Sequence, residues 1–347
     1  MGESVADSME KKKRVLLLST KFRGLYNDIM AEIKRQDYDV VFVEDIVYSK
    51  GRFDDPLRVR RDWARIYSDS KKEEFNQNYW RQIFDDKDFN PYFDYLLVID
   101  GFTVCDYIIS VLKSHNTNIK KVLYMYDSVQ NVYRFDKNFK YFDSIYSFDI
   151  QDAKKFNINL LPIYWTPVEN RANRLDVFGF AGYGPNNNRY NVYKAIYEMA
   201  VNYDLKSYIK LIPNSNNNNR IIKTIQRLLH RDYSLSASTE LVAKEALKPE
   251  EFRDYMSSSR VIVDALMNDQ TGMTTRFSWA IGAGKKIITN NPHIKEYAFY
   301  DPEQVWIYRD GETIPKSFFI EDVEMKEDIK IEVEKFRVDN WVKQLLS

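Results

Sequence analysis

The chain has 347 residues, about two to three times the length of a typical domain, and this length predicts two domains. Hydrophobic residues make up 44% of it and charged residues 29%, which favours folded cores and excludes a disordered composition. The 51 basic and 51 acidic residues give a formal net charge of zero, which argues against a dedicated nucleic-acid-binding protein.

Cysteine and histidine usage restricts the chemistry further. The single cysteine excludes a disulfide framework and a cysteine-based zinc cluster. His115, His230 and His293 lie too far apart in the sequence for a histidine metal motif. No apolar run approaches the ~20 residues that span a bilayer, and Val15–Leu18 is too short for a signal-peptide core. We therefore expect a cytoplasmic protein without a metal or other cofactor.

The first domain, predicted over 14–166, alternates short apolar runs with helix-like segments. Runs of four or five residues rich in β-branched and aromatic side chains are typical of strands buried on both faces. The predicted strands are Val15–Leu18, Val40–Val43, Tyr95–Ile99, Val122–Tyr126, Ile145–Phe148 and Leu160–Tyr164. Helices are expected over Leu25–Gln36 and from Thr103, as the N-cap, to Ser114. Such alternation predicts a parallel, doubly wound sheet.

Residues 50–92 interrupt this alternation. A helix predicted within them carries Arg58, Arg61 and Arg65 on one face. Three interpretations of that face stay open: a solvated charged surface, a site for an anionic acceptor, and a peripheral contact with the inner face of a membrane.

The alternation begins again after a polar linker around 169–174 and predicts a second domain over 175–325. Its predicted strands are Val177–Ala181, Tyr208–Ile212, Tyr233–Leu235, Val261–Ala265, Lys286–Thr289 and Val305–Tyr308, and its predicted helices are 189–203, 220–231, 249–258 and 274–283. Residues 326–347 are predicted to form a terminal helix that crosses back to the first domain. The pattern predicts an α/β protein of two Rossmann-like domains facing a cleft between the carboxyl ends of their sheets.

The clearest chemical signal lies between Arg260 and Asn291, where a strand, a turn containing Gly272 and a helix follow one another. Glycine allows a ligand to approach the backbone closely, and the N–H groups and dipole of a helix start favour an anion. Hydroxyl groups and a guanidinium suited to phosphate follow in the same turn, on Thr271, Thr274, Thr275 and Arg276. The turn predicts a diphosphate cradle, with ordinary helix capping as the alternative role of the threonines.

A second glycine-containing turn begins at Gly182 and Tyr183, after the first strand of the second domain and before a helix that opens at Arg189. It is predicted to form another wall of the same pocket, with Arg189 on the diphosphate. Lys210, in the next strand, is either a further donor-binding cation or a solvated lysine.

Polar loops follow the predicted strands of the first domain. Ser19 and Arg23 are candidate acceptor-binding residues in the first of these loops. Asp127 is the candidate general base that takes a proton from an acceptor hydroxyl, with capping of the next segment as its alternative role, and Asp100 is the competing candidate. Neither of the two Asp-x-Asp strings lies at this edge of the sheet, so no metal site is predicted.

Two parts of the chain resemble the bacterial GT-B glycosyltransferases of capsule and lipopolysaccharide synthesis. The first part is Gln270-Thr271-Gly272-Met273-Thr274-Thr275-Arg276, continued by 282–291 and 297–300. The second is Tyr126-Asp127-Ser128, continued by 141–149, Asp152 and Leu161-Pro162. The similarity follows the chain in order over most of 14–346. The resemblance implies a nucleoside-diphosphate-sugar donor held by the second domain, a saccharide or lipid-linked saccharide acceptor held by the first, and transfer that needs no metal.

One position departs from that family. In many of its members a glutamate follows the arginine by three residues and contacts the donor, whereas this chain has Trp279 there. The leading hypothesis is a metal-independent hexosyltransferase. The alternatives are a transferase with another donor, such as a pyruvyl transferase, and a non-catalytic carbohydrate-binding relative on the same fold.

Overall fold

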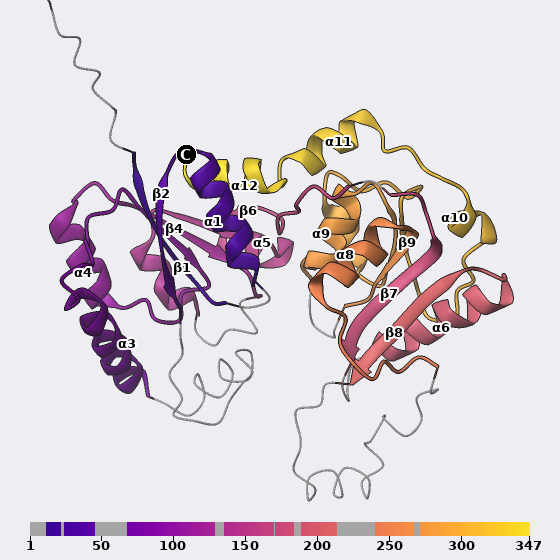
Figure 1. Ribbon diagram of the computed structural model, residues 1–347, viewed down its shortest axis with the longest axis horizontal. Coiled ribbons are helices and arrows are strands. Elements are labelled where there is room, and N and C mark those ends of the chain that lie inside the picture. Colours follow the sequence, from indigo (N-terminus) through magenta and orange to yellow (C-terminus); the bar gives the residue numbers. More distant parts are fainter. Residues whose placement is uncertain are drawn as a thin grey trace, which may run out of the picture. The chain divides into compact units, whose positions relative to one another are not determined.

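The computed structural model describes residues 12–21, 24–45, 68–128, 135–169, 171–183, 189–213, 240–266 and 271–347. The chain divides into two compact units. The first unit is Met1–Leu161 together with Val338–Ser347, and the second unit is Pro162–Arg337. Each unit is built on a parallel β-sheet with helices packed against it (Figure 1).

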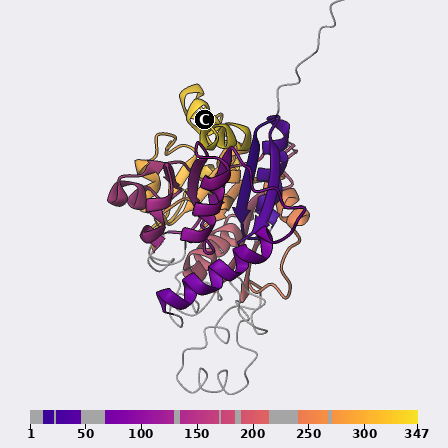
Figure 2. The same cartoon turned by 90° about the vertical axis from the view of Figure 1, so that its left-hand side faces the viewer.

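The sheet of the first unit has the strand order β2-β1-β3-β4-β5-β6, and all its neighbouring strands are parallel. Its strands are β1 (Arg14–Ser19), β2 (Asp39–Glu44), β3 (Tyr95–Ile99), β4 (Lys120–Met125), β5 (Ser144–Ser147) and β6 (Asn159–Leu160). Its helices are α1 (Leu25–Arg35), α3 (Asp69–Phe84), α4 (Asp106–His115), the 3₁₀ helix Phe135–Tyr141, α5 (Ile150–Phe156) and α12 (Val338–Leu345). Helices α3 and α4 cover one face of the sheet, and α1 and α12 cover the other (Figures 1 and 2).

The C-terminal segment departs from the prediction of one helix over 326–347. It forms α11 (Glu327–Glu334) in the second unit and α12 in the first. Between them Phe336 is buried, and its carbonyl accepts a hydrogen bond from the Trp165 N–H at 3.1 Å. Helix α12 packs against α1, and the Trp341 ring lies edge-on to Tyr124 with ring centroids 4.6 Å apart. Tertiary contacts therefore divide an apolar stretch that is continuous in sequence.

The sheet of the second unit has the strand order β11-β10-β9-β7-β8, again all parallel. Its strands are β7 (Leu175–Tyr183), β8 (Ser207–Pro213), β9 (Ser259–Asp264), β10 (Lys286–Thr289) and β11 (Val305–Ile307). Its helices are α6 (Arg189–Asn202), α8 (Pro249–Ser257), α9 (Thr275–Gly282), the 3₁₀ helix Pro292–Glu296, α10 (Lys316–Ile320) and α11. Helices α6 and α10 share one buried cluster against the sheet, while α8 and α9 lie on its other face (Figure 1).

Each sheet has a topological switch point. In the second unit the chain leaves β7 through α6 toward β8, whereas it leaves the adjacent β9 through α9 in the opposite direction, toward β10. In the first unit β1 and β3 are related in the same way. Loops diverge at such a point, which opens a crevice outside the carboxyl ends of the two strands where ligands of open α/β sheets bind. The candidate site is therefore sought at these edges.

The segment that precedes β7 differs most from the prediction. Residues Leu160–Tyr164 were expected as a strand of the first domain, but β6 ends at Leu160, and 162–166 belong to the second unit. The Trp165 indole N–H donates to the Val333 carbonyl at 2.9 Å, and a Cβ atom built on Gly282 would lie 2.2 Å from the Trp165 ring. Ile163, whose carbonyl accepts from the Ser278 hydroxyl of α9, and Trp165 are therefore held by α9 and α11 rather than by pairing in the sheet of the first unit.

The remaining predicted elements agree with the structure to within a few residues where it describes them. Pro249 is the first residue of α8, as predicted from its position before two acidic residues. The predictions for 220–231, for Tyr233–Leu235 and for the helix with Arg58, Arg61 and Arg65 lie outside the described residues. Within the described part of the chain, no helix combines the length and the apolar character needed to cross a membrane.

Candidate functional site

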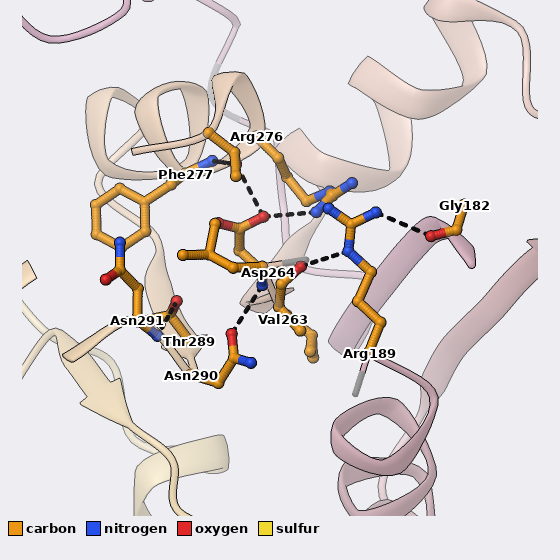
Figure 3. A network of polar contacts seen from close by, with 12 residues as sticks. Gly182, Arg189, Val263, Asp264, Arg276, Phe277, Thr289, Asn290 and Asn291 are labelled. Atoms are coloured by element: carbon orange, nitrogen blue, oxygen red, sulfur yellow. Dashed lines mark hydrogen bonds and ion pairs between the residues drawn. The ribbon is translucent and has the colours of Figure 1, made fainter. Parts of the chain in front are cut away.

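The polar residues at the carboxyl edge of the second sheet form one connected network (Figure 3). Asp264, the last residue of β9, is buried with 1% of its surface exposed. Its Oδ1 atom accepts a hydrogen bond from the Arg276 guanidinium at 2.5 Å and a second one from the Thr274 hydroxyl at 2.9 Å. A single carboxylate thus holds the first turn of α9 against the end of β9.

Thr274 is the N-cap of α9. Its hydroxyl oxygen accepts from the Phe277 N–H at 3.1 Å while its proton points to Asp264. Threonine is favoured at this position because its oxygen satisfies an N–H group that has no partner within the helix. The capping role left open by the sequence is confirmed for Thr274, and both hydrogen-bonding functions of its hydroxyl are already engaged.

Arg189 joins the two strands that flank the switch point. Its Nε atom donates to the Ala265 carbonyl at 2.6 Å, and its Nη1 atom donates to the Gly182 carbonyl at 2.9 Å (Figure 3). Gly182 lies near the end of β7 and Ala265 directly follows β9. The guanidinium therefore lies where the switch-point crevice is expected. Tyr183 ends β7, but its side chain and residues 184–188 lie outside the described parts.

Two asparagines after β10 fix the loops around this network. The Asn291 side-chain amide donates to the carbonyls of Thr271 at 3.0 Å and Gly272 at 3.3 Å, and the Asn290 side chain accepts from the Leu266 N–H at 2.7 Å. No role of these asparagines or of Asp264 was predicted from the sequence. The one feature of the sequence that could have indicated these three residues is that each is a polar residue at or just after the end of a predicted buried strand.

Arg276 is charged and carries an unused donor. Burial alone would lower the pKa of its guanidinium, but Tyr193 and the Asp264 carboxylate outweigh that effect and raise the pKa. Its Nε atom is buried and has no hydrogen-bond partner among the residues that the structure describes. A buried N–H group without an acceptor is costly, so this atom is suited to an oxygen atom of an incoming ligand.

Two further residues singled out in the second domain stand apart from the network. Lys210 donates its ammonium hydrogen bond to the Glu240 backbone carbonyl. Trp279 packs beneath the Arg253 guanidinium, which lies 4.9 Å from the centre of its ring. The Trp279 indole N–H is buried, and no acceptor for it is present in the described part of the chain. Thr275 is the first residue of α9 and is half-buried. The network thus unites Gly182, Arg189, Thr271, Gly272, Thr274 and Arg276.

In the first unit, Asp100 and Asp127 lie at the carboxyl ends of β3 and β4. Asp100 is buried, adopts a left-handed backbone conformation (φ 68°), and accepts from the Tyr126 N–H at 2.8 Å. Asp127 is half-buried. The Asp100 contact is that of a carboxylate that shapes the loop after β4. Ser19 is buried at the end of β1 and donates to the Thr20 carbonyl at 3.3 Å, and Arg23 lies outside the described residues.

A buried carboxylate that was not predicted from the sequence organises the loop after β3. Asp45 accepts from the N–H groups of Gly101, Phe102 and Thr103 at 3.0, 2.6 and 2.8 Å, and from the Thr103 hydroxyl at 2.7 Å. The prediction that Thr103 is the N-cap of α4 is therefore wrong, because Cys105 occupies that position. Three backbone N–H groups converging on one oxyanion make this loop rigid.

The part of the chain that the structure describes contains no group of three or more His, Cys, Asp or Glu side chains arranged to hold a metal ion. The groups that the described residues bring to the carboxyl edge of the second sheet are guanidinium, carboxylate, amide, hydroxyl and backbone groups near the start of α9.

No protein-family model and no curated protein sequence matches the chain. Among solved structures, sucrose-phosphate synthase from Thermosynechococcus elongatus aligns with 96% of this chain and 98% of its own, at 9% identity and a TM-score of 0.50. UDP-GlcNAc 2-epimerase from Neisseria meningitidis, bound to UDP-GlcNAc, aligns over 96% and 98% at 11% identity and a TM-score of 0.44. Arabidopsis thaliana UGT89C1 complexed with UDP aligns over 97% and 100% at 9% identity and a TM-score of 0.46.

The two parallel sheets and the similarity to the synthase show the fold class. It is α/β with two Rossmann-like domains, the GT-B fold. The predicted fold class is confirmed, and at this level of identity the similarity is one of fold alone.

Proposed function

We propose that the chain is a glycosyltransferase that moves a hexosyl group from a nucleoside-diphosphate sugar to a saccharide or lipid-linked saccharide acceptor, in bacterial capsule or lipopolysaccharide synthesis. The observation that carries the proposal is the network of Asp264, Arg276 and Arg189 at the switch point of the second sheet. Open α/β sheets bind ligands at this place, and the groups gathered here are suited to an anion.

The diphosphate of the donor is proposed to lie at the start of α9. The helix dipole supplies positive potential there, and the unused Nε–H of Arg276 donates to a phosphate oxygen. Asp264 orients the guanidinium, and Asn291 holds the backbone of Thr271 and Gly272. Cleavage of the sugar–phosphate bond leaves negative charge on the nucleoside diphosphate. Fixed cationic and dipolar groups stabilise that charge in the transition state, so the proposal needs no metal ion.

The acceptor is proposed to bind the first unit near the carboxyl ends of β1 and β4, with Ser19 among its contacts. Asp127 is proposed as the general base that removes the proton of the attacking hydroxyl. Asp100 is less suited to this role, because it is buried and one of its oxygens accepts from the Tyr126 N–H.

A transfer assay tests the proposal. The protein is incubated with hexoses linked to uridine, guanosine, cytidine or thymidine diphosphate and with capsule or lipopolysaccharide oligosaccharides, and the products are weighed by mass spectrometry. We expect one donor to release its nucleoside diphosphate and the acceptor to gain one hexosyl group. An acceptor that gains a pyruvyl group instead, or no product with any donor, contradicts the proposal.

Two observations favour a second candidate, a non-catalytic binding protein on the same fold. The Arg276 Nη1 atom is already paired with Asp264, and the position expected to contact the donor holds Trp279, which packs beneath Arg253. On this alternative a nucleoside diphosphate or a saccharide binds without turnover. Binding measured by calorimetry together with an absence of product in the transfer assay distinguishes it from the enzyme.

A further inference from the structure

A second polar pocket, of about 440 Å³, opens at the opposite edge of the second sheet. Four segments line it: residues 171–173 before β7, Arg260 near the start of β9, the turn 283–286 between α9 and β10, and residues 321–323 after α10. Its lining residues Arg260 and Lys286 place it at the amino ends of β9 and β10, whereas the Asp264 network lies after the carboxyl end of β9. The pocket is therefore separate from the proposed donor site.

Cations outnumber carboxylates on the pocket lining. Four cationic residues, Arg171, Arg260, Lys285 and Lys286, accompany two acidic ones, Glu321 and Asp322. Three of the cations have strong internal partners. Arg171 pairs with Asp254, Arg260 pairs with Asp322 at 2.9 Å and Asp176 at 3.1 Å, and Lys286 donates to the carbonyls of Phe318 at 3.2 Å and Glu321 at 2.7 Å.

Lys285 is the exception. Only 7% of its surface is exposed, yet the one hydrogen bond that its ammonium makes within the described chain joins Nζ to the neutral Asn173 Oδ1 at 3.3 Å. No carboxylate oxygen of the described residues lies within 4.0 Å of this ammonium. Burial lowers the pKa of Lys285, and the Asp322 charge, which does not pair with the ammonium directly, only partly offsets this effect. A buried ammonium in this position is costly unless an anion joins it.

We propose that this pocket binds a small phosphate ester that also carries hydroxyl groups, with Lys285 as the main phosphate ligand. A phosphate group has enough oxygens to contact Lys285 and the neighbouring Arg260 together. Gly284 leaves the approach open, because a Cβ atom built on it meets nothing within 4 Å. Glu321 and Asp322 accept from the hydroxyl groups of the ligand. The volume exceeds that needed by a lone ion and lies in the range of small-molecule sites, roughly 300–1,000 Å³.

Calorimetric titration of the full chain with inorganic phosphate, glycerol phosphate and glycerol tests the proposal. We expect glycerol phosphate to bind more tightly than inorganic phosphate, and glycerol not to bind. Lys285→Met should weaken glycerol phosphate binding about tenfold or more, since a hydrogen bond to a charged group is lost. Lys285→Arg, which retains the charge, should keep most of the affinity. Lys295→Met is the matched control on an exposed lysine of the same unit, and its affinity should equal that of the wild type.

Melting temperatures of the wild type and of Lys285→Met show whether a loss of binding comes from the missing ammonium or from a folding defect. Without phosphate, Lys285→Met should melt at or above the wild-type temperature, because a buried unpaired charge has been removed; with glycerol phosphate only the wild type should gain stability. The proposal is overturned if the wild type binds neither phosphate compound, if sodium chloride at equal ionic strength gives the same response, or if Lys285→Met binds as tightly as the wild type. Nucleoside-diphosphate binding by Lys285→Met should be unchanged, which separates this pocket from the proposed donor site.

Discussion

Replacing Asp264 by asparagine is expected to lower the free energy of unfolding of the second unit by about 3–5 kcal/mol, the usual loss when one partner of a buried ion pair is removed. The substitution keeps the size of the side chain but removes its charge. Arg276, whose side chain is 14% exposed, is left without the carboxylate that holds it. The Thr274 hydroxyl, which caps α9, also loses its charged acceptor. Urea denaturation of the wild type and the variant measures the difference.

Asp322→Asn is the matched control for this prediction. It makes the same chemical change at an ion pair with Arg260 in the same unit, but the Asp322 side chain is 77% exposed. Exposed pairs contribute little, so this variant should lose about 1 kcal/mol or less. Adding Arg276→Met to Asp264→Asn removes the stranded charge and should recover much of the loss. A loss in Asp264→Asn no greater than that in Asp322→Asn would refute the role given to the Asp264–Arg276 pair.

Replacing Asp127 by asparagine is expected to slow sugar transfer by about 10²–10⁴-fold, the usual contribution of a general base. The amide has nearly the shape of the carboxylate but does not take a proton from the acceptor hydroxyl. Because the donor is proposed to bind the second unit, the affinity for the nucleoside diphosphate should stay at the wild-type value. The transfer assay gives the rate, and calorimetry gives the affinity.

The matched control is Asp100→Asn, at the end of the neighbouring strand. Asparagine tolerates the left-handed conformation of Asp100, and its side-chain oxygen still accepts from the Tyr126 N–H, so the fold should be kept. We expect its transfer rate to lie within a few-fold of the wild type, and the rate of Asp127→Asn to fall with no change in melting temperature. If Asp100→Asn loses the rate and Asp127→Asn retains it, the two assignments are reversed.

The fold class was predictable because parallel strands are buried on both faces. Short runs such as Val15–Leu18 and Tyr95–Ile99 become apolar throughout under that constraint, and both lie within or match strands of the structure. The same signal misled at Leu160–Tyr164. Leu161, Ile163 and Tyr164 are buried, but they follow the end of β6 and belong to no strand of the described sheets. An apolar run in the sequence indicates that its residues are buried, but it does not indicate whether a sheet or a helix buries them.

The place of Arg189, Thr274 and Arg276 at the carboxyl edge of the second sheet was predictable from the sequence, but their hydrogen-bond partners were not. Helix capping by Thr274 is a local pattern that a sequence can show. The bonds that fix Arg189 to Ala265 and Asn291 to Gly272 join residues from separate strands and loops, and only the order of strands in the sheet brings them together. Asp264 looked like an ordinary strand residue for the same reason.

Hydrogen–deuterium exchange of the full chain, with and without each of the four nucleoside diphosphates, tests most directly whether the second unit holds the donor diphosphate at its switch point. We predict that at least one nucleotide slows amide exchange in 271–277 and in the first turn of α6, while the turn 283–286 at the opposite edge exchanges as before. A nucleotide that binds but protects neither 271–277 nor α6, or the failure of all four to bind, would contradict the account.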